Sequence, residues 1–144
     1  MYPSREEIER ELGERKELTN KVLLVDDDPD IVFAIQTALT DYVSQGRYEV
    51  LTAGDGLNAL DIFAGKRPRV MVLDIMLPQM SGFLVMEKIR AEVPEEQRPR
   101  TIIITANEGR RHKQYALAMG VREEDYLTKP FELAQLVERV HAYI

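Results

Sequence analysis

The fold is decided by the stretch from Arg69 to Gly82, which reads Arg-Val-Met-Val-Leu-Asp-Ile-Met-Leu-Pro-Gln-Met-Ser-Gly. Four consecutive apolar residues in it run directly into one carboxylate, Asp74. A short apolar run bounded by a turn signal is typical of a strand that is buried on both faces, although periodicity alone leaves a buried helix open. The pattern therefore places Asp74 at the end of a buried strand.

Two other apolar runs have the same shape. Residues 22–25 lead into three acids, Asp26, Asp27 and Asp28, and residues 102–104 lead into Thr105. Ligands of open α/β sheets bind outside the carboxyl ends of the parallel strands. We therefore expect these strand ends to meet in a site built from carboxylates and a hydroxyl.

The rest of the chain alternates between expected strands and expected helices. Strands are expected at 22–25, 48–53, 70–73, 102–104 and 125–128, and helices at about 29–42, 57–63, 83–91, 110–119 and 131–144. Parallel strands need crossover connections, which are almost always right-handed. Five strands alternating with five helices therefore predict an α/β fold with a parallel sheet covered on both faces.

The amino-terminal segment has a different character. Ser4 followed by Glu7 is a capping-box pattern, so a helix is expected within residues 4–18. Its apolar stripe holds only three residues, Ile8, Leu12 and Leu18, and Gly13 interrupts it. We therefore expect residues 1–20 to form a charged, mostly exposed arm that adds little to the core and is dispensable for folding, and residues 21–144 to form the compact domain.

Composition narrows the function class. A net charge of −6 argues against a nucleic-acid-binding domain, and the basic run at 110–113 is expected to be a solvated helix face. The absence of cysteine excludes disulfides and thiolate metal sites. No apolar stretch approaches the roughly 18 residues of a membrane span, and no signal peptide is evident. We expect a cytoplasmic protein with neither membrane nor nucleic-acid partners.

The acids at the strand ends point to a metal. Asp28 precedes Pro29 and is expected to cap a helix. Asp26, Asp27 and Asp74 would repel one another in one pocket unless a cation intervened, and hard carboxylate oxygens suit Mg²⁺. Thr105 and Lys129 each have an ordinary alternative, as a strand end and as a surface lysine. Together at strand ends, however, a hydroxyl and an ammonium would gather phosphoryl oxygens beside a metal.

Four pieces in this order resemble the receiver (CheY-like) domains of two-component response regulators, and the resemblance covers Lys21 to Ile144. The matching pieces are Leu-Leu-Val-Asp26-Asp27-Asp28, Val-Leu-Asp74-Ile-Met-Leu-Pro78 with Gly82, Ile-Ile-Thr105-Ala106, and Tyr126-Leu-Thr-Lys129-Pro130-Phe131. The resemblance implies a flavodoxin-like (βα)5 fold with a five-stranded parallel sheet of order 2-1-3-4-5. Two features depart from the family pattern: the segment before Lys21, and a connection from Gly120 to Tyr126 that is about two residues longer than usual.

The resemblance also implies roles for individual residues. Asp74 would be the phosphoacceptor, and Mg²⁺ would be held by Asp26, Asp27, Asp74 and the backbone carbonyl of Met76. Thr105 and Lys129 would contact the phosphoryl group, and Tyr126 would be the switch aromatic. A cis peptide is expected before Pro130.

We therefore expect a phosphoacceptor domain that receives a phosphoryl group from a sensor histidine kinase or a histidine phosphotransfer protein. Phosphorylation would reshape the face formed by the fourth helix, fifth strand and fifth helix of the domain. No turnover of an external metabolite is expected, the downstream protein partner is unidentified, and a homodimer is left open. Two alternatives are a docking module that acts without phosphorylation and a haloacid dehalogenase-type hydrolase, suggested by Asp26-x-Asp28. The haloacid dehalogenase pattern has Thr or Val two residues after its second acid, where this chain has Asp30.

Overall fold

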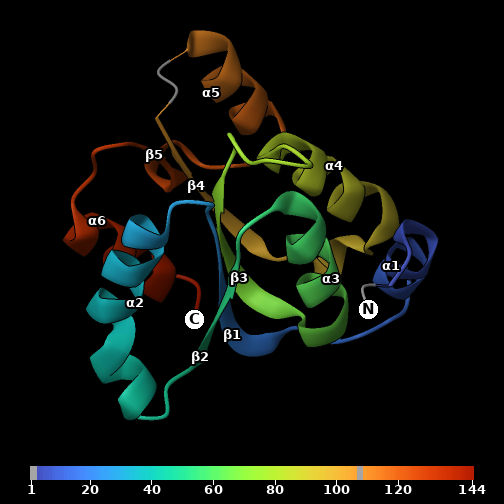
Figure 1. Ribbon diagram of the computed structural model, residues 1–144, viewed down its shortest axis with the longest axis horizontal. Coiled ribbons are helices and arrows are strands. Elements are labelled where there is room, and N and C mark those ends of the chain that lie inside the picture. Colours follow the sequence, from blue (N-terminus) through green and yellow to red (C-terminus); the bar gives the residue numbers. More distant parts are fainter. Residues whose placement is uncertain (1–2, 107–108) are drawn as a thin grey trace.

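Five parallel strands form one sheet, in the order β2-β1-β3-β4-β5, in the computed structural model, which describes residues 3–106 and 109–144 (Figure 1). The strands are β1 (Thr19–Val25), β2 (Glu49–Ala53), β3 (Pro68–Asp74), β4 (Arg100–Thr105) and β5 (Tyr126–Thr128). The α-helices are α1 (Arg5–Leu12), α2 (Pro29–Ser44), α3 (Gly56–Lys66), α4 (Gly82–Glu92), α5 (Arg110–Ala118) and α6 (Leu133–His141). The predicted fold class and strand order are confirmed.

Helices cover both faces of the sheet and divide the core in two (Figure 1). Alternate residues of β1 show the division: Leu23 and Val25 face the cluster that includes α1, α3 and α4, whereas Val22 and Leu24 face α2 and α6. Burial of both faces explains why the central strands read as unbroken apolar runs. Among the described residues, no helix is long and apolar enough to cross a membrane.

The strand register brings the predicted site residues to one edge. Val25 pairs with Leu73, Asp74 pairs with Ile104, and Thr105 pairs with Thr128. The carboxyl ends of β1, β3, β4 and β5 therefore lie side by side. Residues that follow these strands in the sequence meet there, although they come from parts of the chain up to 103 residues apart.

The amino-terminal segment differs from expectation. The Ser4 capping box forms, but the helix ends at Leu12 rather than continuing toward residue 18. Most described residues of this segment are exposed, as expected. The expectation that it adds little to the core is wrong, because Ile8 and Leu12 are only 2% and 0% exposed and join the α3–α4 core. These two apolar side chains bury one face of the helix although its apolar stripe is thin. The division of the chain at residue 20 stays a prediction; β1 begins at Thr19.

The long connection before β5 contains a 3-10 helix, η2 (Glu123–Asp125). Asp125 is buried and accepts a hydrogen bond at 2.7 Å from Nε of Arg139 on α6, and the Tyr143 hydroxyl also donates to it. The added residues thus tie the start of β5 to the last helix. Another 3-10 helix, η1 (Glu95–Gln97), precedes β4.

Candidate functional site

Three carboxylates lie together at the carboxyl edge of the sheet. Asp26, Asp27 and Asp74 can each offer one oxygen such that all three atoms lie within 4.8 Å of one another. Asp26 and Asp74 are both 4% exposed, whereas Asp27 faces solvent. The strand ends therefore gather the predicted acids into one cluster that is open on one side.

Lys129 bridges the two buried acids. Its Nζ lies 2.7 Å from Oδ2 of Asp26 and 3.0 Å from Oδ2 of Asp74. The backbone N–H of Lys129 donates to the carbonyl of Thr105 at 2.7 Å, which fixes the lysine next to the end of β4. The Lys129–Pro130 peptide is cis, as expected. The lysine is therefore part of the site rather than an unrelated surface residue.

The electrostatics of this cluster follow from burial and pairing. Burial raises the pKa of Asp26 above its ordinary value, although hydrogen bonds from Lys129 and from the backbone N–H of Asp28 oppose that rise. Burial alone would lower the pKa of Lys129, but its hydrogen bonds and charge contacts with Asp26 and Asp74 outweigh this effect and leave the pKa raised. The ammonium of Lys129 therefore stays charged and offsets part of the negative charge.

The third adjacent acid has a structural role. Oδ1 of Asp28 accepts a hydrogen bond from the backbone N–H of Asp30 at 2.9 Å and caps α2, with Pro29 at the first helical position. Asp28 is not a member of the carboxylate cluster. The expected role of Asp28 as a helix cap is confirmed.

The remaining predicted residues surround the acids. Met76 is 58% exposed, and its backbone N–H donates to Oδ1 of Asp74 at 2.9 Å. Thr105 is completely buried at the end of β4. Tyr126 begins the neighbouring strand β5; it is 9% exposed, and its buried hydroxyl has no hydrogen-bond partner within the described structure. All seven predicted site residues thus lie on adjoining strand ends or on the loop that follows β3.

Two glycines hold the loop after β3 close to the acids. A Cβ on Gly82 would lie 2.5 Å from the carbonyl oxygen of Asp74, and a Cβ on Gly56 would lie 2.3 Å from that of Met80. No side chain fits at such separations without movement of the backbone. The amino ends of α3 and α4 therefore pack directly against the backbone of the loop formed by residues 75–81.

Sequence reasoning missed the buried polar residues away from this edge. Arg67 is 1% exposed in a left-handed conformation (φ 50°). The contact between Asp125 and Arg139 also went unanticipated. The one available signal was the position of Arg67 before Pro68, which disfavours a helical backbone conformation; the sequence gives no signal for the partners of these side chains.

A cavity of about 650 Å³ lies at the opposite edge of the sheet. Its lining includes Arg69 and Arg100, which lie near the starts of β3 and β4. None of the predicted site residues lines it. The carboxylate cluster, and not this cavity, carries the chemistry that the sequence predicts.

Comparison with known proteins agrees with this geometry. The family model described as the response regulator receiver domain matches residues 22–141. The chain is 37% identical over 126 residues to the probable transcriptional regulatory protein TcrX of Mycobacterium tuberculosis, and 34% identical over 124 residues to the response regulator MprA of a Mycobacterium species. These alignments cover 85% and 86% of this chain but 49% and 50% of the relatives, so the chain spans about half their length.

Solved structures give the same result. The receiver domain of the Francisella response regulator 1452 aligns with a TM-score of 0.72 and 30% identity, covering 86% of this chain and 95% of that one. The chemotaxis protein CheY4 of Vibrio cholerae aligns with a TM-score of 0.71 and 28% identity, covering 90% and 100%. With a family model that spans most of its length and a site at the matching strand ends, this chain belongs to the response regulator receiver domains.

Proposed function

We propose that this domain accepts a phosphoryl group on Asp74 in a Mg²⁺-dependent reaction and uses it as a signal. The observation that carries the proposal is the bridging of Asp26 and Asp74 by Nζ of Lys129, at 2.7 and 3.0 Å. A buried carboxylate beside a second acid and a fixed ammonium can act as a nucleophile toward phosphorus while its surroundings offset the incoming negative charge.

The residues present fit a Mg²⁺ ion. Three carboxylate oxygens converge within 4.8 Å, and hard oxygen donors of this kind, completed by water and phosphate oxygens, suit Mg²⁺. Asp26, Asp27, Asp74 and the carbonyl of Met76 would hold the ion. When bound, Mg²⁺ would neutralise charge on the transferring oxygens.

The chain's own residues perform the remaining steps. A carboxylate oxygen of Asp74 attacks the phosphorus of a phosphohistidine, the P–N bond breaks, and its electron pair returns to the imidazole nitrogen. The product is an acyl phosphate on Asp74 and a free histidine in the donor. Lys129 moves from the carboxylates toward the new phosphoryl oxygens, and the Thr105 hydroxyl donates to one of them.

The donor would be a sensor histidine kinase or a histidine phosphotransfer protein, and we place the reaction in the cytoplasm. The domain would act on itself and turn over no external metabolite. The downstream partner remains to be identified, and a homodimer is one arrangement through which the signal could pass. A docking module that acts without phosphorylation is the alternative, but the acceptor and both acids of the metal site are retained.

Incubation with acetyl phosphate and Mg²⁺ tests the proposal. We expect intact-mass spectrometry to show the gain of one phosphoryl group in the parent, and none when Mg²⁺ is chelated or when Asp74→Asn is used. An unchanged parent mass under all conditions would favour the docking alternative.

Phosphorylation would be read out through Thr105 and Tyr126. A dianionic group beside Thr105 should draw its hydroxyl inward and change the packing of the Tyr126 ring. This would reshape the face formed by α5, β5 and α6, which are the fourth helix, fifth strand and fifth helix counted from residue 21. The ring is already largely buried, and its unpaired hydroxyl makes this position sensitive to a change in its neighbours. A full reversal from about 1:99 to 99:1 needs a differential of roughly 5.5 kcal/mol, which several charge-assisted hydrogen bonds and a metal can supply.

The Thr105→Ala variant separates phosphorylation from this response. We expect it to accept phosphate on Asp74 while its NMR shift changes around Tyr126 and α5 shrink relative to the phosphorylated parent. Equal shift changes in the two proteins would show that the Thr105 hydroxyl does not carry the response.

A further inference from the structure

The helix α1 lies outside the matched receiver-domain stretch, yet it packs against both α3 and α4 (Figure 1). Ile8 and Leu12 enter the shared core, and Nζ of Lys88 on α4 donates to Glu9 at 2.6 Å. Along this face of the sheet, α1 therefore connects α3 to α4.

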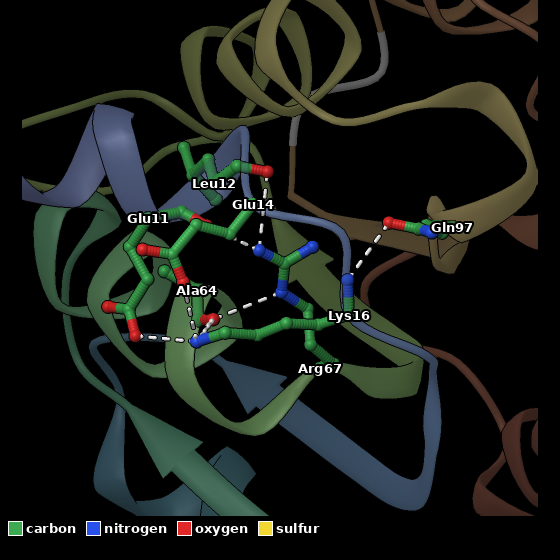
Figure 2. Close-up of polar contacts among 7 residues, drawn as sticks. All are labelled: Glu11, Leu12, Glu14, Lys16, Ala64, Arg67 and Gln97. Atoms are coloured by element: carbon green, nitrogen blue, oxygen red, sulfur yellow. Dashed lines mark hydrogen bonds and ion pairs between the residues drawn. The ribbon is translucent and has the colours of Figure 1, made fainter.

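Arg67 holds the carboxyl end of α1, as Figure 2 shows. Its Nη2 donates to the carbonyls of Glu11 at 2.6 Å and Leu12 at 3.2 Å, and its Nε donates to Ala64 of α3 at 3.0 Å. The last carbonyls of a helix have no partner within it and carry the negative end of its dipole. The buried guanidinium therefore binds α1 to α3 through groups that exist only at a helix end.

The segment after α1 is also tied down. Nζ of Lys16 contacts Glu11 at 2.7 Å and the carbonyl of Ala64 at 3.2 Å, and the backbone N–H of Lys16 donates to Gln97 at 3.2 Å (Figure 2). The docked position is thus specified by several polar contacts.

Docking of α1 also carries an energetic cost, because it buries the charge of Arg67. Nη1 of Arg67 is buried without a hydrogen-bond partner in the described chain, and Nε and Nη2 donate to backbone carbonyls rather than to carboxylates. A buried charge without an ionic partner is costly, and an eight-residue helix is marginal on its own. Undocking would return the charge to water, which offsets part of the free energy lost when Ile8 and Leu12 become exposed.

The two helices that α1 connects lead to the acidic site. The loop of residues 75–81 carries Met76 and lies between the amino ends of α3 and α4, where Gly56 and Gly82 leave no room for a side chain. The backbone N–H of Gly82 also donates to the carbonyl of Ile75 at 3.1 Å. A change in the spacing of α3 and α4 must therefore move this loop.

We propose that α1 is a built-in regulatory helix: docked through Arg67, it holds α3, α4 and the 75–81 loop in the arrangement that binds Mg²⁺, and undocked it loosens that loop. The proposal rests on the proposed function only in taking Asp26, Asp27 and Asp74 as the metal site. Because coupling between two sites is reciprocal, Mg²⁺ favours docked α1 by the same factor by which docking favours Mg²⁺.

Hydrogen exchange of the full chain, with and without Mg²⁺, tests this. The Arg67→Met variant keeps an unbranched stem but removes the donors; Arg15→Met, which removes an exposed arginine paired with Glu96, is the matched control. We expect Arg67→Met to raise the exchange rates of the α1 amides at least about tenfold, and those of Met76 and Gly82 as well, and to weaken Mg²⁺ binding. The control stays within about twofold of the parent.

A second variant acts from the other side of the contact. Ile8→Asp places a carboxylate where only apolar atoms fit, so it undocks α1 without touching Arg67, and protected β1 and β3 amides confirm that the domain is folded. Unchanged α1 exchange in Arg67→Met would overturn the role of Arg67. Exposed α1 with unchanged loop exchange and Mg²⁺ affinity in both variants would overturn the coupling. If the parent bound no Mg²⁺, the metal site would be wrong, while the loop amides would still test the coupling.

Discussion

Asp26, Asp27 and Asp28 are consecutive in the chain but face different surroundings. Asp26 points inward to Lys129, Asp27 remains exposed beside Asp74, and Asp28 turns back to cap α2. One residue of difference in position therefore separates a buried carboxylate, an exposed carboxylate that we propose as a metal ligand, and a helix cap.

This division predicts unequal effects of two equal changes of charge. Asp27→Asn should weaken Mg²⁺ binding by at least about tenfold, because it removes a direct ligand. Asp28→Asn should change it much less, since asparagine caps helices as well as aspartate does. Calorimetric titration of both variants measures the order, and the reverse order would overturn the assignment.

The site residues could be predicted because each follows an apolar run or belongs to a motif of adjacent residues. Arg67 and the Asp125–Arg139 pair could not, because the partners of a buried polar side chain are chosen by tertiary packing. Asp125 in particular stands after two exposed acids, Glu123 and Glu124, from which the sequence does not distinguish it.

At the level of elements, α6 packs against α2, and its residue His141 contacts Tyr48, which directly precedes β2. Nε2 of His141 lies 2.8 Å from the Tyr48 hydroxyl, and the imidazole meets the Tyr42 ring edge-on at 4.3 Å. Burial lowers the pKa of His141 below 6.5, and the charge of Arg47 adds to this effect. The folded protein therefore favours the neutral imidazole.

Folding stability therefore depends on pH through His141. Below pH 6.5 the unfolded chain binds a proton at His141 that the folded chain resists, so folding stability falls as the pH drops from 6.5 toward the lower folded pKa. We expect the parent to lose more stability than His141→Gln between neutral and mildly acidic pH. Urea titrations at several pH values measure the difference; parallel pH profiles would contradict a partly buried histidine that is neutral in the folded protein.

Element types were predictable where an apolar pattern was long or a cap was local, as for α2 with Asp28 and Pro29. The residues at which helices begin and end were harder to predict. The helix α6 begins at Leu133 rather than at Phe131, and α1 ends at Leu12. The position of α1 depends on its packing against α3 and α4, which come together only in the folded chain. Counting apolar residues along one helix could not reveal it.

For the whole molecule, the docking of α1 argues against the expectation that the amino-terminal segment is dispensable for folding. Leu12→Ala should destabilise the protein by about 2 kcal/mol, at the low end for a buried leucine, because undocking of α1 limits the cost of a cavity. Arg10→Ala, on the exposed side of the same helix, should stay within about 0.5 kcal/mol of the parent. Equal denaturant midpoints for the two variants would show that α1 is not part of the core.

The overall topology was predictable because five apolar runs alternate with helical patterns, and right-handed crossovers leave few arrangements. That topology by itself brings Asp26, Asp74, Thr105 and Lys129 to one edge. We propose that the groups at this edge make Asp74 a phosphoacceptor.

Chemical trapping of the acyl phosphate tests that claim most directly. After phosphorylation with acetyl phosphate and Mg²⁺, borohydride reduction converts a phosphorylated aspartate to homoserine, which peptide mass spectrometry locates. We predict homoserine at position 74 in the parent, and none there in Asp74→Asn or without Mg²⁺. Homoserine at Asp26 or Asp27 instead, or at no position in the parent, would contradict the account.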